Sequence, residues 1–274
     1  MIPIAKYKFF FKTESFDLDQ YKIYASNISP SLWDLVREDT KDYDFEKEIL
    51  PVIKYFLHHK EAADAAHDSF LRATNLCAKN NLLLDKVDIT VIFYMGLCSG
   101  AGWVTKLDKK PVILLGVEKI VELNWCDDTG MNGLIYHELG HAWHFQNRIA
   151  PNVFHTSKQK SLWQLYTEGM AMYFEQMLMN DSRFYHQDKN GWLNWCCENK
   201  QKIAQEYLRN CENNKSCQNF FGDWSNFEGY SDVGYFLGGE VLRLISKDHT
   251  TEELINLDLN LFEDYLKKYV FNMK

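Results

Sequence analysis

Apolar positions along the chain follow two different spacings, and the spacing changes near residue 87. Before that point, apolar residues lie three or four positions apart, as in Val52, Ile53, Phe56 and Leu57 and again over residues 60–77. Such spacing predicts amphipathic helices. Residues 87–96, VDITVIFYMG, are instead rich in β-branched and aromatic residues and predict a strand.

A glycine-rich turn and a second apolar run follow this strand. Residues 97–103, LCSGAGW, predict the turn, and VILLG after Pro111 predicts another strand. The two strands form either a β-hairpin or two strands of one sheet, and a short helix follows over residues 118–123. Helical spacing returns at residues 129–146 and 160–180. The remainder is mainly helical, with aromatic-rich turns around residues 219–235.

The order of elements predicts an α+β fold that is mainly α, with helices, then a small sheet, then helices again. A chain of 274 residues fits one large domain or two small ones. We expect a helical N-terminal region over residues 1–85 and a second domain over residues 86–274, packed as one compact unit.

Composition and charge narrow the classes of protein. A hydrophobic fraction of 46% is enough for a core, and a net charge of −8 argues against a nucleic-acid partner. No run approaches the ~20 apolar residues of a membrane span. The N-terminal segment lacks the apolar run of a secretory signal, because it is interrupted by Lys6, Lys8 and Lys12. Seven cysteines without paired metal spacing are typical of reduced thiols, so we expect a cytoplasmic protein.

The strongest chemical signal is His137-Glu138-Leu139-Gly140-His141, an H-E-x-x-H pattern inside a predicted helix. Residues four apart project from one face of a helix, so both imidazoles can reach a single Zn²⁺. Glu138 lies beside the first ligand and can act on water at the metal. Gly140 weakens a helix, which indicates close approach of a neighbouring element. The alternative is a helix whose two histidines are purely structural.

A catalytic zinc site takes three protein ligands, and Glu168 is the best candidate for the third. It follows His141 by 27 residues, which is enough for one helix to end and another to return antiparallel. Gly169 and Ala171 are small and let two helices approach, while Glu175 on the same helix face is a rival ligand. His144 lies seven residues from His137, about 10.5 Å of helix rise. We therefore expect His144 to lie just outside the metal's ligands or to line the substrate cleft.

These motifs resemble the gluzincins, which are zinc metallopeptidases with two histidines and a downstream glutamate as ligands. His137–His141 matches their zinc helix, and Glu168-Gly-Met-Ala171 is similar to the third-ligand helix of several of their families. The chain also resembles predicted bacterial zinc-dependent proteases, over residues 87–245. It departs from the pattern in having no Asn before Glu168 and no Asp four residues after it. The resemblance implies a zincin-like fold and a peptide or protein substrate.

The residues support hydrolysis of a peptide bond by a zinc-activated water with Glu138 as the general base. Tyr235 is our first candidate for the oxyanion donor, with Tyr230 and His155 as alternatives. An extended substrate is expected to pair with the edge of the strand over residues 111–116, close to Gly116.

Two other functions use the same motif. A regulatory zinc protease would cleave one specific partner such as a repressor, although about 136 residues precede the zinc helix here. A degenerate zincin would bind a peptide without cutting it, but such a protein has no chemical need for Glu138. The oligomeric state and the substrate cannot be read from the sequence.

Overall fold

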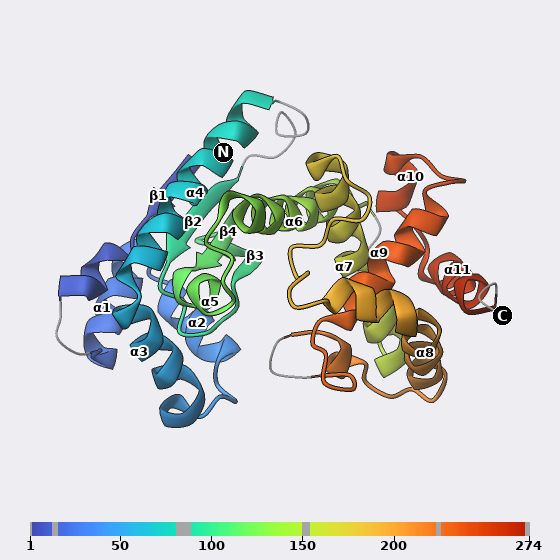
Figure 1. Cartoon of the computed structure of the whole chain (residues 1–274), viewed down its shortest axis with the longest axis horizontal. Coiled ribbons are helices and arrows are strands. Elements are labelled where there is room, and N and C mark those ends of the chain that lie inside the picture. Colours follow the sequence, from blue (N-terminus) through green and yellow to red (C-terminus); the bar gives the residue numbers. More distant parts are fainter. Residues whose placement is uncertain (1, 13–15, 81–88, 150–153, 223–225, 272–274) are drawn as a thin grey trace. The chain divides into compact units, whose positions relative to one another are not determined.

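The computed structural model of the protein describes residues 2–12, 16–80, 89–149, 154–222 and 226–271, which are mainly helical with one four-stranded sheet (Figure 1). This confirms the expected α+β class. The chain divides into two compact units, Met1–Glu138 and Leu139–Lys274. The division falls inside one helix, α6 (Asp128–Asn147). The boundary that we expect at residue 85 lies outside the described residues.

The first unit contains the sheet, whose strands lie in the order β1-β2-β4-β3. Strands β1 (Ile2–Ala5), β2 (Thr90–Tyr94) and β4 (Lys110–Gly116) are parallel, and β3 (Gly102–Leu107) is antiparallel to β4. The apolar runs in β2 and β4 are almost entirely buried, as expected for central parallel strands.

The sheet confirms one of the two predicted arrangements and adds an unpredicted strand. The two predicted strands are β2 and β4, which pair side by side in parallel, so they are two strands of one sheet and not a hairpin. Strand β3 begins within the segment that we expect to be only a turn, and it forms a hairpin with β4. Because β4 pairs on both sides, it has no free edge for a substrate, and that expectation is wrong. Residues 87 and 88 of the predicted first strand lie outside the described residues.

Helices of the first unit pack around the sheet, and Figure 1 shows α4 beside β1 and β2. Phe70 of α4 stacks on Phe93 of β2 with ring centroids 5.1 Å apart. Two tyrosines of α1 hold the end of β2, since Tyr21 donates to the Met95 carbonyl and Tyr24 accepts from the Met95 amide. In chain order the helical segments are η1 (Lys8–Lys12), α1 (Leu18–Ile28), α2 (Leu32–Asp39), the π-helical turn η2 (Phe45–Ile49), α3 (Leu50–His58), α4 (Lys60–Asn80) and α5 (Val117–Glu122).

Helices are the main elements of the second unit's described part, and helix α7 contacts α8, α9 and α11. The N-terminus of α7 is fixed by a capping box, in which the side chains of Thr156 and Gln159 each bond to the other's backbone. Asn180 ends α7 in the left-handed conformation, with φ of 54°. The helical segments are α7 (Ser157–Met179), α8 (Trp192–Glu212), η4 (Gln218–Phe220), α9 (Val233–Ile245), α10 (Thr251–Ile255) and α11 (Leu259–Phe271).

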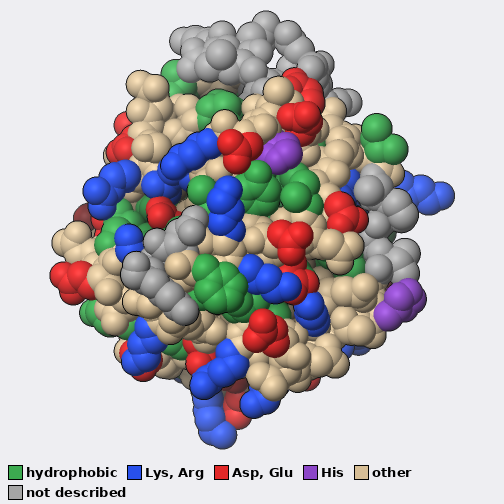
Figure 2. Space-filling model, turned by 90° about the vertical axis from the view of Figure 1, so that its right-hand side faces the viewer, with side chains coloured by type: hydrophobic (Ala, Val, Ile, Leu, Met, Phe, Trp, Pro, Cys, Tyr) green, Lys and Arg blue, Asp and Glu red, His purple; other side chains and the backbone are tan. Residues whose placement is uncertain are grey.

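The described surface carries charges of both signs. On the face shown in Figure 2, Lys and Arg side chains alternate with Asp and Glu, and no broad area of one sign appears. Within the described residues, no helix combines the length and the apolar character needed to cross a bilayer.

Helices α7 and α9 cross at a pair of glycines. A Cβ atom added at Gly169 would lie 2.6 Å from the carbonyl oxygen of Gly238, and one added at Gly238 would lie 2.8 Å from that of Leu165. Both contacts are with backbone, so the helices would have to separate to admit a side chain. The sequence places Gly169 against the zinc helix, whereas the structure places it against α9.

We therefore expect Gly238→Ala to lower the free energy of unfolding by about 1–3 kcal/mol, because the added methyl group overpacks a backbone contact. The matched control is Gly239→Ala on the same helix, where the nearest atom is the Tyr185 hydroxyl at 3.1 Å. That hydroxyl accepts from Arg243 and would have to shift by a few tenths of an ångström, which offsets the roughly 0.5–1 kcal/mol by which alanine favours a helix, so this variant should stay close to the wild type. Denaturant unfolding measures both, and equal stability of the two variants would contradict the glycine crossing.

Candidate metal centre

Helix α6 carries the H-E-x-x-H motif and lies close to α7 at Gly140. A Cβ atom added at Gly140 would lie 2.9 Å from Cα of Ala171 and 2.8 Å from Cβ of Phe174. Both are closer than real Cβ contacts, so any other residue here would push α6 away from α7. The close approach that the glycine predicts is therefore confirmed, and Ala171 is the small residue that faces it.

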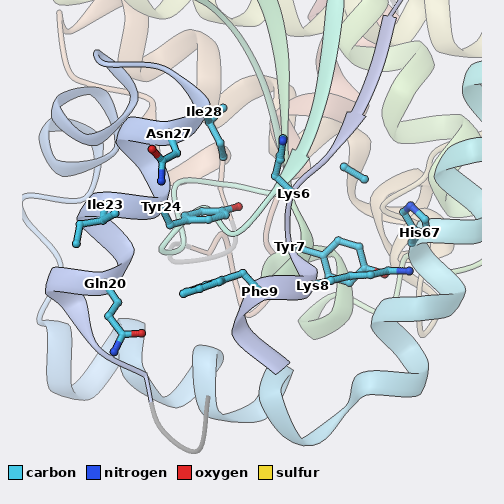
Figure 3. Close-up of a pocket in the computed structure, with 11 residues that line it drawn as sticks. Lys6, Tyr7, Lys8, Phe9, Gln20, Ile23, Tyr24, Asn27, Ile28 and His67 are labelled. Atoms are coloured by element: carbon cyan, nitrogen blue, oxygen red, sulfur yellow. The ribbon is translucent and has the colours of Figure 1, made fainter. Parts of the chain in front are cut away.

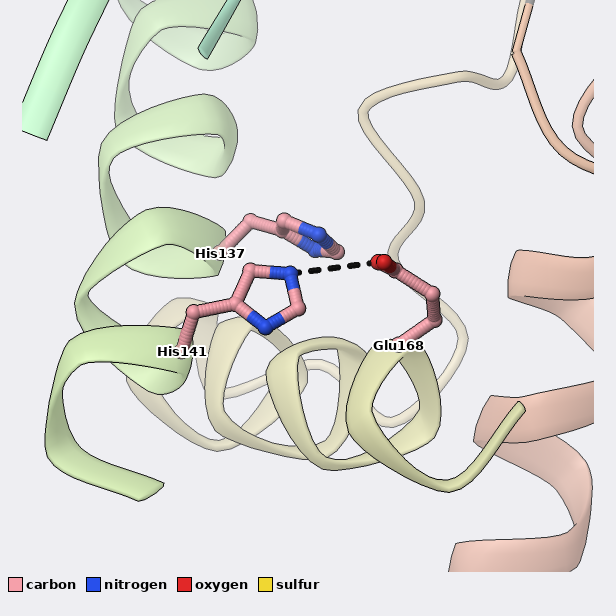
Figure 4. Close-up of side chains that lie close together, drawn as sticks. All are labelled: His137, His141 and Glu168. Atoms are coloured by element: carbon pink, nitrogen blue, oxygen red, sulfur yellow. Dashed lines mark hydrogen bonds and ion pairs between the residues drawn. The ribbon is translucent and has the colours of Figure 1, made fainter. Parts of the chain in front are cut away.

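This approach brings together the ligands predicted from the sequence. The candidate ligand atoms of His137, His141 and Glu168 all lie within 4.8 Å of one another (Figure 4). Nε2 of His141 is 3.1 Å from Oε2 of Glu168. The division between the two units follows Glu138 directly, and one continuous helix holds His137 a single turn before His141. Buried and half-buried His and Glu groups here could hold a metal ion.

The donor set, and the spacing of the His141 and Glu168 atoms, fit a tetrahedral ion. Two ligand atoms, each about 2.1 Å from a tetrahedral zinc, lie about 3.4 Å apart, close to the separation of the His141 and Glu168 atoms. His137 is 3% exposed, while the side chains of His141 and Glu168 are 12% and 17% exposed. Partial exposure of two ligands leaves the group accessible from one side.

Glu138 is buried, and its carboxylate lies against the first residue of β3. A Cβ atom added at Gly102 would lie 2.7 Å from Oε1 of Glu138. A larger residue at this position would have to displace the carboxylate or the strand. Gly102 therefore leaves the space that the Glu138 carboxylate occupies.

A second buried group shares His137. Ligand atoms of His137, Glu175 and His186 also lie within 4.8 Å of one another, and all three side chains are buried. The Glu175 carboxylate accepts from the backbone amide of His186 at 3.0 Å, and both its oxygens lie 2.9 Å from Nδ1 of the same residue. We name Glu175 as a rival ligand from the sequence. His186 was missed, because a lone histidine outside any motif gives no signal.

Two predicted substrate-contacting residues are buried. His144 has no exposed surface, and its ring packs against the rings of Phe145, Trp163 and Tyr166. It belongs to the core and not to a cleft, which corrects our expectation. Gly116 ends the central strand β4, and a Cβ atom there would lie 2.4 Å from the Gly100 carbonyl oxygen. This buried position is no place for a substrate.

Tyr235 lies in the first turn of α9, and its ring stands edge-on to that of Phe221 with centroids 5.7 Å apart. Its alternatives lie elsewhere in the second unit. Tyr230 stacks on Trp195, and the backbone amide of His155 donates to Gln159 ahead of α7. The oxyanion role of Tyr235 stays a prediction.

The burial of His144 predicts a pH dependence of stability. Burial, helped by the positive charge of Arg148, lowers its pKa from 6.5 to about 3. Below pH 6.5 the unfolded chain binds a proton that the folded protein does not, so stability is lost as the pH falls. With a chelator present, the free energy of unfolding of the wild type should fall more steeply than that of His144→Phe, by up to about 1.4 kcal/mol per pH unit between pH 6.5 and 3. Parallel curves for the two proteins would contradict this burial effect.

Known proteins add nothing to this description. Comparison of the chain with protein-family models, with curated proteins and with solved structures finds no match. The donor atoms and their geometry therefore carry the assignment of a function.

Proposed function

We propose that this protein is a zinc-dependent peptidase that hydrolyses a peptide bond with Glu138 as its general base. The observation that supports this most strongly is the grouping of His137, His141 and Glu168 with all ligand atoms within 4.8 Å. Glu138 follows the first of these ligands directly in the chain. The grouping agrees with the resemblance of the motifs to gluzincins.

The donor chemistry favours zinc. Two imidazole nitrogens and one carboxylate oxygen form a His₂Glu set, which in catalytic zinc sites leaves one position open. Zinc bound there supplies a Lewis acid that lowers the pKa of a water ligand to about 7 and polarises the scissile carbonyl group. Calcium and magnesium prefer sites composed of oxygen ligands, so the two histidines argue against them.

Glu138 performs the proton transfers in this proposal. Its carboxylate takes a proton from the attacking water and then gives a proton to the leaving amine. The carboxylate is buried and has room beside Gly102, where a larger residue would displace it from the position that transfer requires. Tyr235 is our candidate donor to the oxyanion that forms on the carbonyl oxygen.

The substrate in this proposal is an extended peptide that pairs with β3. Among the described strands, β3 pairs only with β4, so its outer edge offers backbone groups to a peptide. The strand begins at Gly102, next to the Glu138 carboxylate. A peptide along β3 would therefore approach the general base through backbone hydrogen bonds.

The metal ligands can be tested by elemental analysis. We expect one zinc per chain in the wild type and strongly reduced zinc in Glu168→Ala, because two histidines alone hold the ion weakly. Glu206→Ala is the control, since Glu206 pairs with Arg209 on α8 outside the ligand group. Equal zinc in wild type and Glu168→Ala would move the third ligand elsewhere, and no zinc after reconstitution would contradict the site.

The role of Glu138 can be tested separately. Glu138→Gln keeps the size of the side chain but cannot accept the proton, so hydrolysis of a fluorogenic peptide library should fall by about 10²–10⁴-fold. Zinc content should remain that of the wild type, because Glu138 is not a ligand in this proposal. Full hydrolysis by the variant, or hydrolysis by wild type stripped of metal, would refute the mechanism.

A further inference from the structure

A pocket of about 560 Å³ lies in the first unit, between helix α1 and the segment that joins β1 to η1 (Figure 3). Its volume is within the range of small-molecule sites, roughly 300–1,000 Å³. All its lining residues belong to the first unit, whereas the ligand group described above depends on α6 and α7. It takes no part in the proposed hydrolysis.

One wall of the pocket is aromatic and aliphatic. Figure 3 shows the rings of Phe9 and Tyr24 projecting toward each other, and they are stacked with centroids 6.4 Å apart and planes 16° apart. Ile23 of α1 lies beside them and is 64% exposed, while Phe9 is 44% exposed. Large apolar side chains exposed together mark a site for an apolar partner.

Hydrogen bonds hold two tyrosines that line the pocket. Tyr7 is fully buried and its hydroxyl donates to Asp64, and the Tyr24 hydroxyl accepts from the Met95 amide. These bonds fix both rings before anything binds, so a ligand would not have to order them.

The lining also carries positive charge without negative charge. Lys6 and Lys8 are both exposed, and none of the lining residues is Asp or Glu although the chain has a net charge of −8. Among the described residues, neither ammonium group lies in an ion pair. Figure 3 shows Lys8 extending past Tyr7 toward His67. The amides of Gln20 and Asn27 add further hydrogen-bonding groups at the rim.

We propose that this pocket binds a free amphiphilic carboxylate, with its apolar body against Phe9, Tyr24 and Ile23 and its negative head attracted by the charges of Lys6 and Lys8. The apolar wall would contact the body of the ligand. Two lysines that lie in no ion pair among the described residues, in a lining without Asp or Glu, would attract its negative head. Two lysines are too few for a nucleic-acid backbone. This site is independent of the proposed hydrolysis.

Isothermal titration of the full chain with decanoate tests the proposal, with decyltrimethylammonium as a probe of the same chain length and opposite charge. We expect decanoate to bind at one site and the cation not to bind. Lys6→Glu/Lys8→Glu should weaken decanoate at least about tenfold, since it reverses both charges at the head. Lys22→Glu/Lys54→Glu changes the net charge equally at exposed positions outside the lining and should bind like the wild type.

A second pair of variants tests the apolar wall. Ile23→Asp should also weaken decanoate about tenfold, because a charge replaces an apolar contact. Leu76→Asp changes a residue that is 40% exposed on α4, outside the lining, and should have no effect. Equal binding of the two decyl probes, or unchanged binding in both pocket variants, would overturn the proposal. Binding to phosphatidylglycerol vesicles without binding of decanoate would also overturn it, in favour of a membrane surface.

Discussion

The contact between α6 and α7 at Gly140 is the constraint on which the candidate metal centre depends. Two helices normally pack with axes 8–10 Å apart, and small residues at the crossing allow the lower end of that range. Gly140 faces Ala171 and Phe174, so its missing side chain lets the histidine-bearing face of α6 approach α7. The 3.1 Å separation of His141 and Glu168 follows from that approach. Because Glu168 is one turn before Ala171, the small residue and the ligand lie on the same side of α7.

A buried carboxylate, that of Glu175, lies in the second group that contains His137. Glu175 has no exposed surface and holds His186 through its backbone amide and its ring. An isolated buried carboxylate is costly, so such a group persists only with hydrogen-bond partners. Metal-ligating histidines typically donate their second ring nitrogen to a carboxylate, which fixes the ring orientation. In the proposed zinc site, Glu175 would suit that role, because its carboxylate lies in one group with His137.

The sequence predicts the long helices and the grouping of His137, His141 and Glu168, because the helical spacing and the H-E-x-x-H motif are local signals. Residues 129–146 and 160–180 have sustained helical spacing, and they form α6 and α7. Strands β1 and β3 were missed, since β1 has only four residues and the side chains of β3 are mostly half-exposed. The error at β4 follows from the second omission, because an unrecognised β3 leaves β4 at the edge. Tertiary packing alone brings His186 beside Glu175 and His137, and the spacing of residues in the sequence does not reveal such contacts.

The hairpin formed by β3 and β4 lies beside the proposed general base. Its first residue, Gly102, pairs with Leu115 of the central strand and at the same time lies against the Glu138 carboxylate. The register of the sheet thus places a glycine where the carboxylate of the proposed general base needs space. The same strand has its other edge free within the described sheet. A peptide added to that edge would take its register from β3, and so its distance from Glu138 would be fixed by the backbone and not by its side chains. Such an arrangement favours recognition of an extended main chain, with sequence preference left to the pockets around it.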